Sequence, residues 1–513
     1  MSLKTYHQNQ LHLIPHTFDD LIPTSHPVRL VSQVINRIDS TALLKAYDEI
    51  GRPGYHPLMM LKIMVYAYMT NTYSSRKIEK ALRENINFMW LSNMTIVDHN
   101  TINRFRNSKL ELCFKDIFRQ IVLMLAEEGL ITLKEIYTDG TKLEAQANRY
   151  SFVWGKAIKT NKAKMLKQLD ELWKYAQQVE LGDQEPSTLE ITAISSDKID
   201  GVLEQIDENI KKHALELDKK TRKKLDTAKK NFKNRLQEYE AKEKILNGRN
   251  SYSKTDHDAT FMRMKEDHMK NGQLKAGYNV QISTENQVIV HYSLHQSSTD
   301  FATLKPHLEQ MRDMYGVEQF KQLKDITADA GYGSEENYQY IESLNIIPYI
   351  KYNTFDHERK QKKSKKAQQN LKNRQFLYYN ATQDYYVCPM GQHMNKVGEK
   401  QSKTSSGFIQ RISIYEAKRC EGCSLRSSCH RGQGNRRIER NHQLESYREV
   451  IHERLLSEEG IEKRKQRSID VEPVFGHIKQ NRGFRRFTLR GLKKVSLEFG
   501  LHALAHNMLK LSA

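Results

Sequence analysis

Two aspartates, Asp139 and Asp329, each follow a short alternating apolar segment and precede a glycine within two residues. The alternation predicts β-strands, and the glycines predict that both strands end in turns. A third carboxylate, Glu472, opens a stretch of helical character that runs to Lys479. Two strand-end aspartates and one helical glutamate are an oxygen-ligand set suited to a pair of Mg²⁺ (or Mn²⁺) ions. This feature therefore requires a fold that brings residues 190 positions apart (329 minus 139) into one site.

The order of the other predicted elements indicates such a fold. Periodicity predicts a hairpin over residues 131–146 that carries Asp139, and a second hairpin over residues 275–294. The elements that follow are a helix over 300–314, the strand ending at Asp329, a helix over 334–344 and a strand over 346–351. With the helix that bears Glu472, this order predicts a ribonuclease-H-like α/β catalytic core made of residues 131–354 and 448–513.

Two segments interrupt this predicted core. Residues 155–250 are rich in Lys and Glu and carry leucines at helical spacing, which predicts a helical, coiled-coil-like arm. Residues 355–447 predict a separate insertion, which begins with the basic run 359–366. Such a run is most often a solvated linker, and contact with nucleic acid is the sharper alternative.

Residues 1–130 are predicted to form a helical N-terminal domain. Asp98 suits the N-cap of a helix that turns Ile102 and Phe105 inward and presents Arg104 and Arg106 outward. A helix, a turn and a polar helix with arginines are compatible with a helix-turn-helix DNA reader. An ordinary helical bundle with a solvated face explains the same pattern equally well.

Four of the five cysteines fall in the insertion at 355–447, namely Cys388, Cys420, Cys423 and Cys429. The Cys420-Glu-Gly-Cys423 spacing is typical of a zinc knuckle, and four thiolates would complete a tetrahedral structural Zn²⁺ site. His430 or His393 could replace one ligand. A redox Cys-x-x-Cys is the competing interpretation, but it does not account for the other two cysteines.

The surroundings of Glu472 are strongly basic, with eleven Lys or Arg and only two acidic residues from Lys463 to Lys494. Nearby cations favour the ionised carboxylate. Lys479 lies seven residues after Glu472, about two helical turns, so it is expected on the same face, where it could hold a phosphate. A basic amphipathic helix with a structural ion pair is the alternative.

The net charge of +20 predicts an acidic polymer as partner. The sequence has no apolar run long enough to span a bilayer and no secretory signal. We therefore expect a cytoplasmic location and no association with a membrane.

The three acidic motifs resemble those of bacterial DDE transposases encoded by insertion sequences, and those of the insertion-sequence 1182 family in particular. The segments that carry the resemblance are Tyr-Thr-Asp139-Gly-Thr-Lys, Thr-Ala-Asp329-Ala-Gly-Tyr-Gly-Ser, and Val-Glu472-Pro-Val-Phe-Gly-His-Ile-Lys479 with its continuation Asn-Arg-Gly-Phe-Arg-Arg-Phe487. One departure is that Lys465 and Ser468 stand where the broader pattern has Tyr and Arg. Arg464 or Arg467 would then make the DNA contact that the arginine of the broader pattern makes.

The resemblance implies a DNA transposase that binds terminal inverted repeats, cleaves DNA at the ends and joins them to a target by two-metal-ion phosphodiester transfer. Asp139, Asp329 and Glu472 would be catalytic and bind Mg²⁺ or Mn²⁺, and the Cys-rich insertion would bind Zn²⁺. The partners would be double-stranded DNA and a second copy of the chain, as a homodimer on DNA in association with the nucleoid. The expected DNA contacts are Lys479, Arg464, Arg467, Arg482, Arg485, Arg486, Arg104 and Arg106.

Two other functions fit the same residues. A ribonuclease-H-like nuclease would cut without joining, and a catalytically inactive DNA-binding protein would use the acidic residues only structurally.

Overall fold

The computed structural model describes residues 17–47, 53–177, 195–212, 219–264, 273–362, 377–404, 406–430 and 432–512. The second half of the basic run at 359–366 lies outside the described residues. Its first four residues are included, at the end of helix α15 (Phe355–Lys362). None of the helices in this described part combines the length and hydropathy needed to cross a bilayer.

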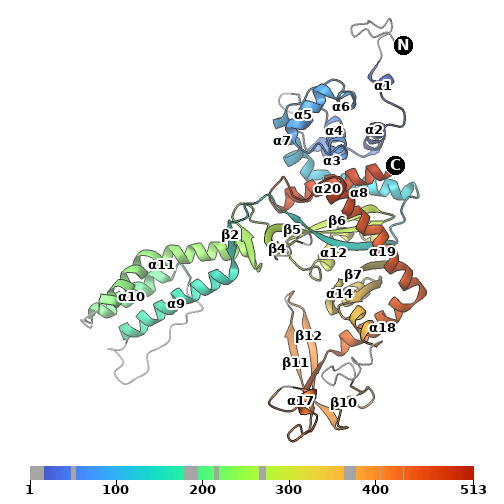
Figure 1. The fold of residues 1–513 in the computed structure, drawn as a ribbon. Coiled ribbons are helices and arrows are strands. Elements are labelled where there is room, and N and C mark those ends of the chain that lie inside the picture. Colours follow the sequence, from blue (N-terminus) through green and yellow to red (C-terminus); the bar gives the residue numbers. More distant parts are fainter. Residues whose placement is uncertain are drawn as a thin grey trace, which may run out of the picture.

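The N-terminal region is helical, as the periodicity predicts (Figure 1). Its elements are α1 (Phe18–Leu21), α2 (Pro27–Arg37), α3 (Thr41–Lys45), α4 (Pro57–Met69), α5 (Ser75–Glu84), α6 (Ile86–Ser92), α7 (His99–Arg104), the π-helix η1 (Phe105–Leu110) and α8 (Glu111–Glu127). Helix α4 begins at Pro57, which has no N–H to leave unpaired in the first turn. Most of α4 is buried, because the C-terminal helix α20 (Leu492–Leu511) packs against it.

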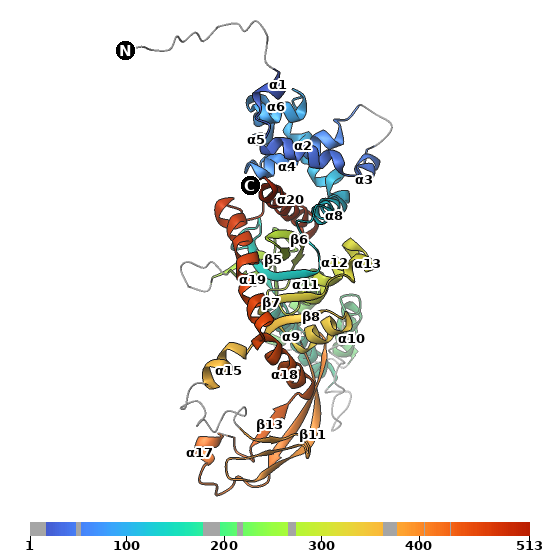
Figure 2. The same ribbon diagram turned by 90° about the vertical axis from the view of Figure 1, so that its right-hand side faces the viewer.

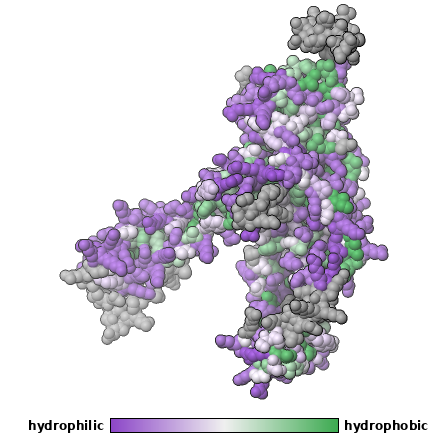
Figure 3. All heavy atoms as spheres, viewed as in Figure 1, coloured by the Kyte–Doolittle hydropathy of each residue, from purple (hydrophilic) through white to green (hydrophobic). Residues whose placement is uncertain are grey.

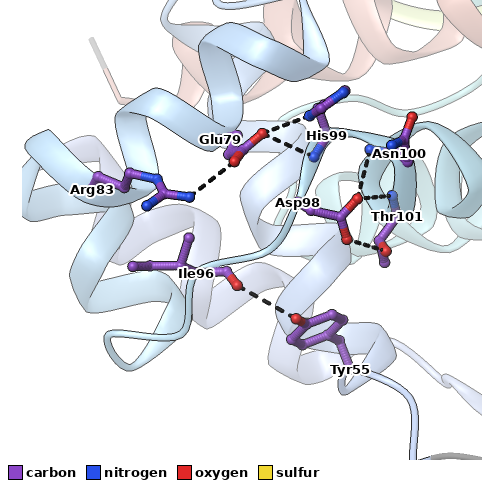
Figure 4. Close-up of polar contacts among 8 residues, drawn as sticks. All are labelled: Tyr55, Glu79, Arg83, Ile96, Asp98, His99, Asn100 and Thr101. Carbon is purple, nitrogen blue, oxygen red and sulfur yellow. Dashed lines mark hydrogen bonds and ion pairs between the residues drawn. The ribbon is translucent and has the colours of Figure 1, made fainter.

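The start of α7 is fixed by polar contacts (Figure 4). Asp98 accepts hydrogen bonds from the backbone N–H groups of Asn100 and Thr101, which confirms it as the N-cap of α7. Glu79 of α5 accepts from the backbone N–H of His99 at 3.2 Å and contacts its Nδ1 at 2.7 Å. These contacts attach the start of α7 to α5.

The central sheet has six strands: β1 (Glu135–Glu144), β4 (Thr260–Arg263), β5 (Leu274–Glu285), β6 (Val288–His295), β7 (Asp325–Gly333) and β8 (Ile347–Tyr352). The order is β4-β5-β1-β7-β8, with β6 also paired to β5. Strand β1 is antiparallel to β5 and parallel to β7, and β7 is parallel to β8. The hairpin predicted over 131–146 is wrong, because these residues form one continuous strand that pairs with β5 and β7 on its two sides.

Helices cover both faces of this sheet (Figures 1 and 2). On one face, His307 of α12 (Leu304–Tyr315) hydrogen bonds Ser283 of β5, whose hydroxyl also contacts Thr138 of β1. On the other face lies α19 (Glu458–Gly476), which crosses β8, β7, β1 and β5. The remaining elements of this part are α13 (Val317–Phe320), α14 (Glu335–Ser343), α18 (His442–Leu456) and the π-helix η4 (His477–Asn481).

The arm predicted over 155–250 contains α9 (Gly155–Gln177), α10 (Ile199–Lys212) and α11 (Lys219–Leu246), and it projects away from the sheet (Figure 1). The short strands β2 (Phe152–Trp154) and β3 (Ser251–Ser253) pair at its base. Leu169, Phe232 and Leu236 belong to a buried apolar cluster separate from the main core. The face of the arm seen in Figure 3 is mostly hydrophilic.

The Cys-rich segment forms its own antiparallel sheet with the order β13-β12-β11-β10-β9. The strands are β9 (Tyr379–Asn380), β10 (Tyr385–Val387), β11 (His393–Lys403), β12 (Ile409–Ala417) and β13 (Arg437–Arg440), with the short helix α17 (Arg426–Cys429) between the last two. A small apolar cluster that includes Tyr386, Met394 and Tyr415 packs this sheet.

We predict that acid destabilises this fold through His291, a buried residue of β6. Burial lowers the pKa of its imidazole to about 3. Its stabilising contribution is complete above pH 6.5 and is lost as the pH falls toward 3, because only the unfolded chain then takes up the proton. At pH 5 the loss is about 2 kcal/mol.

The measurement is the urea midpoint of the wild type and of His291→Leu at pH 7.5 and pH 5. The variant should lose less stability than the wild type between these two pH values. His257→Leu is the matched control, because His257 is exposed. Equal acid sensitivity of the wild type and His291→Leu would contradict the prediction.

Candidate active site at the β1–β7 edge

Strand register places Asp139 beside Asp329. The parallel pairing of β1 with β7 runs from Glu135 opposite Asp325 to Thr138 opposite Ala328. Asp139 and Asp329 are the next residues on the two strands. Neighbouring strands lie about 4.8 Å apart, and side chains at matched positions project from the same face. The two carboxylates predicted from the sequence therefore come from adjacent positions on one face of the sheet.

Glu472 of α19 is linked to Asp139 by one arginine, which contacts both carboxylates. Arg467 contacts Asp139 Oδ2 through Nη1 at 3.2 Å and Glu472 Oε1 through Nη2 at 3.6 Å. The Asp139 side chain is 14% exposed and the Glu472 side chain 58% exposed. Among the described residues, no three side chains of the metal-binding types converge tightly enough to form a complete metal site.

Helix α19 begins fourteen residues before Glu472, so the expectation that Glu472 opens the helix is wrong. Pro473 lies inside the helix and has no N–H to donate to the carbonyl of Ile469. That carbonyl accepts a hydrogen bond from Gln287 Nε2 at 3.0 Å instead, and Asp470 accepts from the Gln287 backbone N–H at 3.1 Å. The turn between β5 and β6 thus satisfies the helix where the proline interrupts it, immediately beside Glu472.

A buried polar network supports the site from the other face of the sheet. Tyr332 donates to Gln281 Oε1, and Gln281 Nε2 donates to Asn279 Oδ1 at 2.9 Å and to Asp300 Oδ1 at 3.3 Å. Burial, followed by the negative charges of Asp139, Asp300 and Asp329, raises the pKa of Tyr332 well above its ordinary value. The phenol therefore stays protonated and available as a donor.

Sequence reasoning missed this network, although a signal was present. Asn279, Gln281 and Ser283 alternate along β5, so one face of a buried strand is polar throughout. Lys463 was also missed as a site residue. Its Nζ contacts Glu135 Oε2 at 2.7 Å and both Asp325 carboxylate oxygens at 3.1 Å, at the start of the same two strands.

The residues expected to contact DNA differ widely in exposure. Arg104, Arg485 and Arg486 are exposed, and Arg464 and Arg467 are half-buried. Lys479 is buried within η4.

Arg106 and Arg482 are buried and bonded internally, so the expectation that Arg106 points outward is wrong. Arg106 donates to the Tyr73 carbonyl, and Arg482 donates to the Tyr68 carbonyl. These two guanidinium groups supply donors to carbonyls at and beyond the end of α4, which is the physical reason for their burial.

The four cysteines of the insertion line one pocket together with His430 and Arg436. All four are free thiols. The backbone N–H of Gln392 donates to Cys388 Sγ, and that of Arg436 donates to Cys420 Sγ, each at 3.3 Å. The fifth cysteine, Cys113, is buried in α8 and packs in the main core, as expected.

Two family models match this chain. Residues 387–512 match the transposase DDE domain, and this range includes the four cysteines of the insertion and Glu472. Residues 16–108 match the transposase domain designated DUF772, which covers most of the N-terminal helices. No curated protein and no solved structure matches the chain. The two matches, one at each end, support a DDE-type insertion-sequence transposase.

We predict that Gly140 is required next to Asp139. A Cβ at this position would lie 2.3 Å from Gln281 Nε2, which is held in the buried network. Gly140→Ala should therefore destabilise the protein by about 1–3 kcal/mol. The measurement is the urea midpoint, with Gly201→Ala in α10 as control because nothing lies within 4 Å of a Cβ there. Equal stability of the two variants would contradict the steric argument.

Proposed function

We propose that the protein is a DNA transposase of the insertion-sequence 1182 family with a ribonuclease-H-like core. The sheet supports this fold. If β1, β5, β6, β7 and β8 are numbered 1 to 5 in chain order, their order across the sheet is 3-2-1-4-5. Only strand 2, which is β5, is antiparallel to its neighbours in this order. The observation that carries the proposal is that Asp139 and Asp329 directly follow the last paired residues of two parallel strands, with Glu472 linked to Asp139 through Arg467. The DDE-domain match, which includes Glu472, agrees with it.

The residues present fit a pair of Mg²⁺ or Mn²⁺ ions. Asp139, Asp329 and Glu472 supply the carboxylate oxygens that such ions prefer. A guanidinium cation lies between Asp139 and Glu472, so this part of the site already accommodates positive charge. When bound, such ions supply activation of the nucleophile and stabilisation of the leaving oxygen in phosphodiester transfer.

The side chains of this chain would hold the reacting DNA in place. Arg485 and Arg486 are exposed a few residues beyond α19, and Arg104 is exposed on α7. Contacts from these cations to phosphates would position the ends of the element and make binding steeply dependent on salt. The water or 3′-hydroxyl that attacks the phosphodiester would approach where the β1–β7 pairing stops, beside Asp139 and Asp329. Both residues lie inside their strands, so the expectation that they end those strands is wrong.

We also propose that Cys388, Cys420, Cys423 and Cys429 bind a structural Zn²⁺. Their common pocket and the two N–H to sulfur bonds support this, because such bonds stabilise thiolate ligands. The separate sheet of this segment has only a small apolar cluster, so a metal would stabilise it substantially.

The proposed partner is double-stranded DNA, bound by a homodimer in the cytoplasm in association with the nucleoid. The arm offers a surface for either contact. Lys224 and Lys229 of α11 pair with acidic residues of α9 and α10, whereas Lys223 and Lys230 are exposed. The exposed lysines would favour contacts with DNA phosphates.

We propose four parts for the chain. They are the N-terminal domain of residues 1–130, the catalytic core of 131–354 and 448–513, the arm of 155–250 within that core, and the insertion of 355–447.

We predict that Asp139→Asn and Glu472→Gln each reduce cleavage of transposon-end DNA by about 100-fold or more, because each removes a charged ligand of the catalytic ions. Binding of the same DNA should change little. The assay uses a labelled duplex with the element's end and resolves both cleaved ends and joined products. Glu462→Gln is the control, since Glu462 is exposed on the same helix. Cleavage by Glu472→Gln at the wild-type rate would refute the assignment, and cleavage without joined products would favour the nuclease.

We predict one tightly bound zinc per chain. Elemental analysis of the purified protein should give about one equivalent, and Cys423→Ser should lose most of it because a closed site needs four ligands. Cys113→Ala should retain it, since Cys113 is in the main core. Full zinc content in Cys423→Ser would contradict the proposed ligand set.

A further inference from the structure

The same arrangement of charges occurs twice along β1, β7 and α19. In each copy, acidic residues of the strands contact a cation of α19. Glu135 and Asp325, which are paired across the two strands, both contact Lys463. Four residues further along each element, Asp139 contacts Arg467, and Asp329 follows the last paired residue of β7, Ala328. Because positions four apart lie on one face of a helix, Lys463 and Arg467 both face the sheet.

The two copies differ in how tightly the cation is held. Lys463 lies 2.7 to 3.1 Å from three carboxylate oxygens, and its side chain is 10% exposed. Burial alone would lower the pKa of Lys463, but the hydrogen bonds and charges of Glu135 and Asp325 raise it, so the amine stays charged. Removing this cation would leave the buried carboxylate of Asp325 without its partner, so we regard Lys463 as a structural part of the fold.

Arg467 is held more loosely. Its contacts are longer, at 3.2 Å to Asp139 and 3.6 Å to Glu472, and the Glu472 side chain is 58% exposed. Its two terminal nitrogens each face a different carboxylate, so the guanidinium lies between the acid from the strand and the acid from the helix. That is the space that a divalent cation shared by Asp139 and Glu472 would need.

We propose that Arg467 is the resident counter-ion of the active site, which neutralises Asp139 and Glu472 in the free protein and must leave them when a divalent ion binds. This inference rests on the proposed function, because it takes the carboxylates to be metal ligands. Its consequence is that Arg467 weakens divalent binding to the free protein. Double-stranded DNA offers the displaced guanidinium a phosphate, so metal and DNA bind cooperatively, with Arg467 as the coupling residue.

The test measures Mn²⁺ binding to the full-length protein by electron paramagnetic resonance of free Mn²⁺, with and without a duplex carrying the element's end. Without DNA, Arg467→Gln should bind Mn²⁺ about tenfold or more tightly than the wild type, because a positive charge a few ångström from the ion has been removed. A residue that only braced the site would weaken binding or leave it unchanged when replaced. The expected sign therefore separates the two roles.

Three controls complete the experiment. Lys465→Gln removes an exposed charge from the same helix and should leave Mn²⁺ affinity within about twofold of the wild type, since exposed charges are screened. Arg467→Lys keeps one charge and should lie between the wild type and Arg467→Gln, which also covers the case in which Arg467→Gln folds poorly. Adding DNA should tighten Mn²⁺ binding in the wild type and have little effect in Arg467→Gln.

The outcomes separate this inference from the proposed function. If wild-type and Arg467→Gln proteins both bind Mn²⁺ with the same affinity, and Asp139→Asn abolishes binding, the metal site stands and the counter-ion role is refuted. If Asp139→Asn leaves Mn²⁺ binding intact, the proposed metal site itself is wrong.

Discussion

The parallel pairing of β1 with β7 is the constraint on which the site depends. Its register sets Glu135 against Asp325 and leads Asp139 and Asp329 to adjacent positions four residues later. Like charges this close are unfavourable unless cations neutralise them. Helix α19 supplies those cations, Lys463 and Arg467, so the sheet and the helix stabilise each other where the acidic residues concentrate.

The position of Glu472 follows from how α19 is attached. Lys463 fixes the helix over the starts of β1 and β7, and Gln287 binds both Asp470 and the carbonyl released by Pro473. A proline inside a helix ordinarily leaves a carbonyl without its donor. Here the hairpin between β5 and β6 provides that donor, which ties the third acidic residue to the sheet that carries the first two.

The two insertions are compatible with this core because each packs around residues of its own. The arm has a cluster around Leu169 and Phe232, and the Cys-rich sheet has one around Tyr386 and Tyr415. An inserted unit that buries its own apolar surface does not compete with the main core. The C-terminal helix α20 has the opposite role, because it lies between α4 and β6 and joins the N-terminal helices to the sheet. The two ends of the chain, which match separate transposase domains, are therefore one packed structure.

The sequence by itself determined the helical N-terminal region, the N-cap at Asp98 and most of the strands of the sheet, because hydrophobic periodicity and glycine turns are local signals. The catalytic role of the three carboxylates stays a prediction. It misjudged the segment around Asp139 as a hairpin, since an alternating strand does not show which strands will pair with it. It also predicted that the Arg106 side chain is exposed, whereas its guanidinium donates to the Tyr68 hydroxyl and to the Tyr73 carbonyl. Only the tertiary structure decided that Arg467 lies between Asp139 and Glu472 and that Lys463 joins two strands 190 residues apart (325 minus 135). Such contacts depend on strand register and on the crossing of a helix over the sheet, and both are set by packing between segments far apart in the chain.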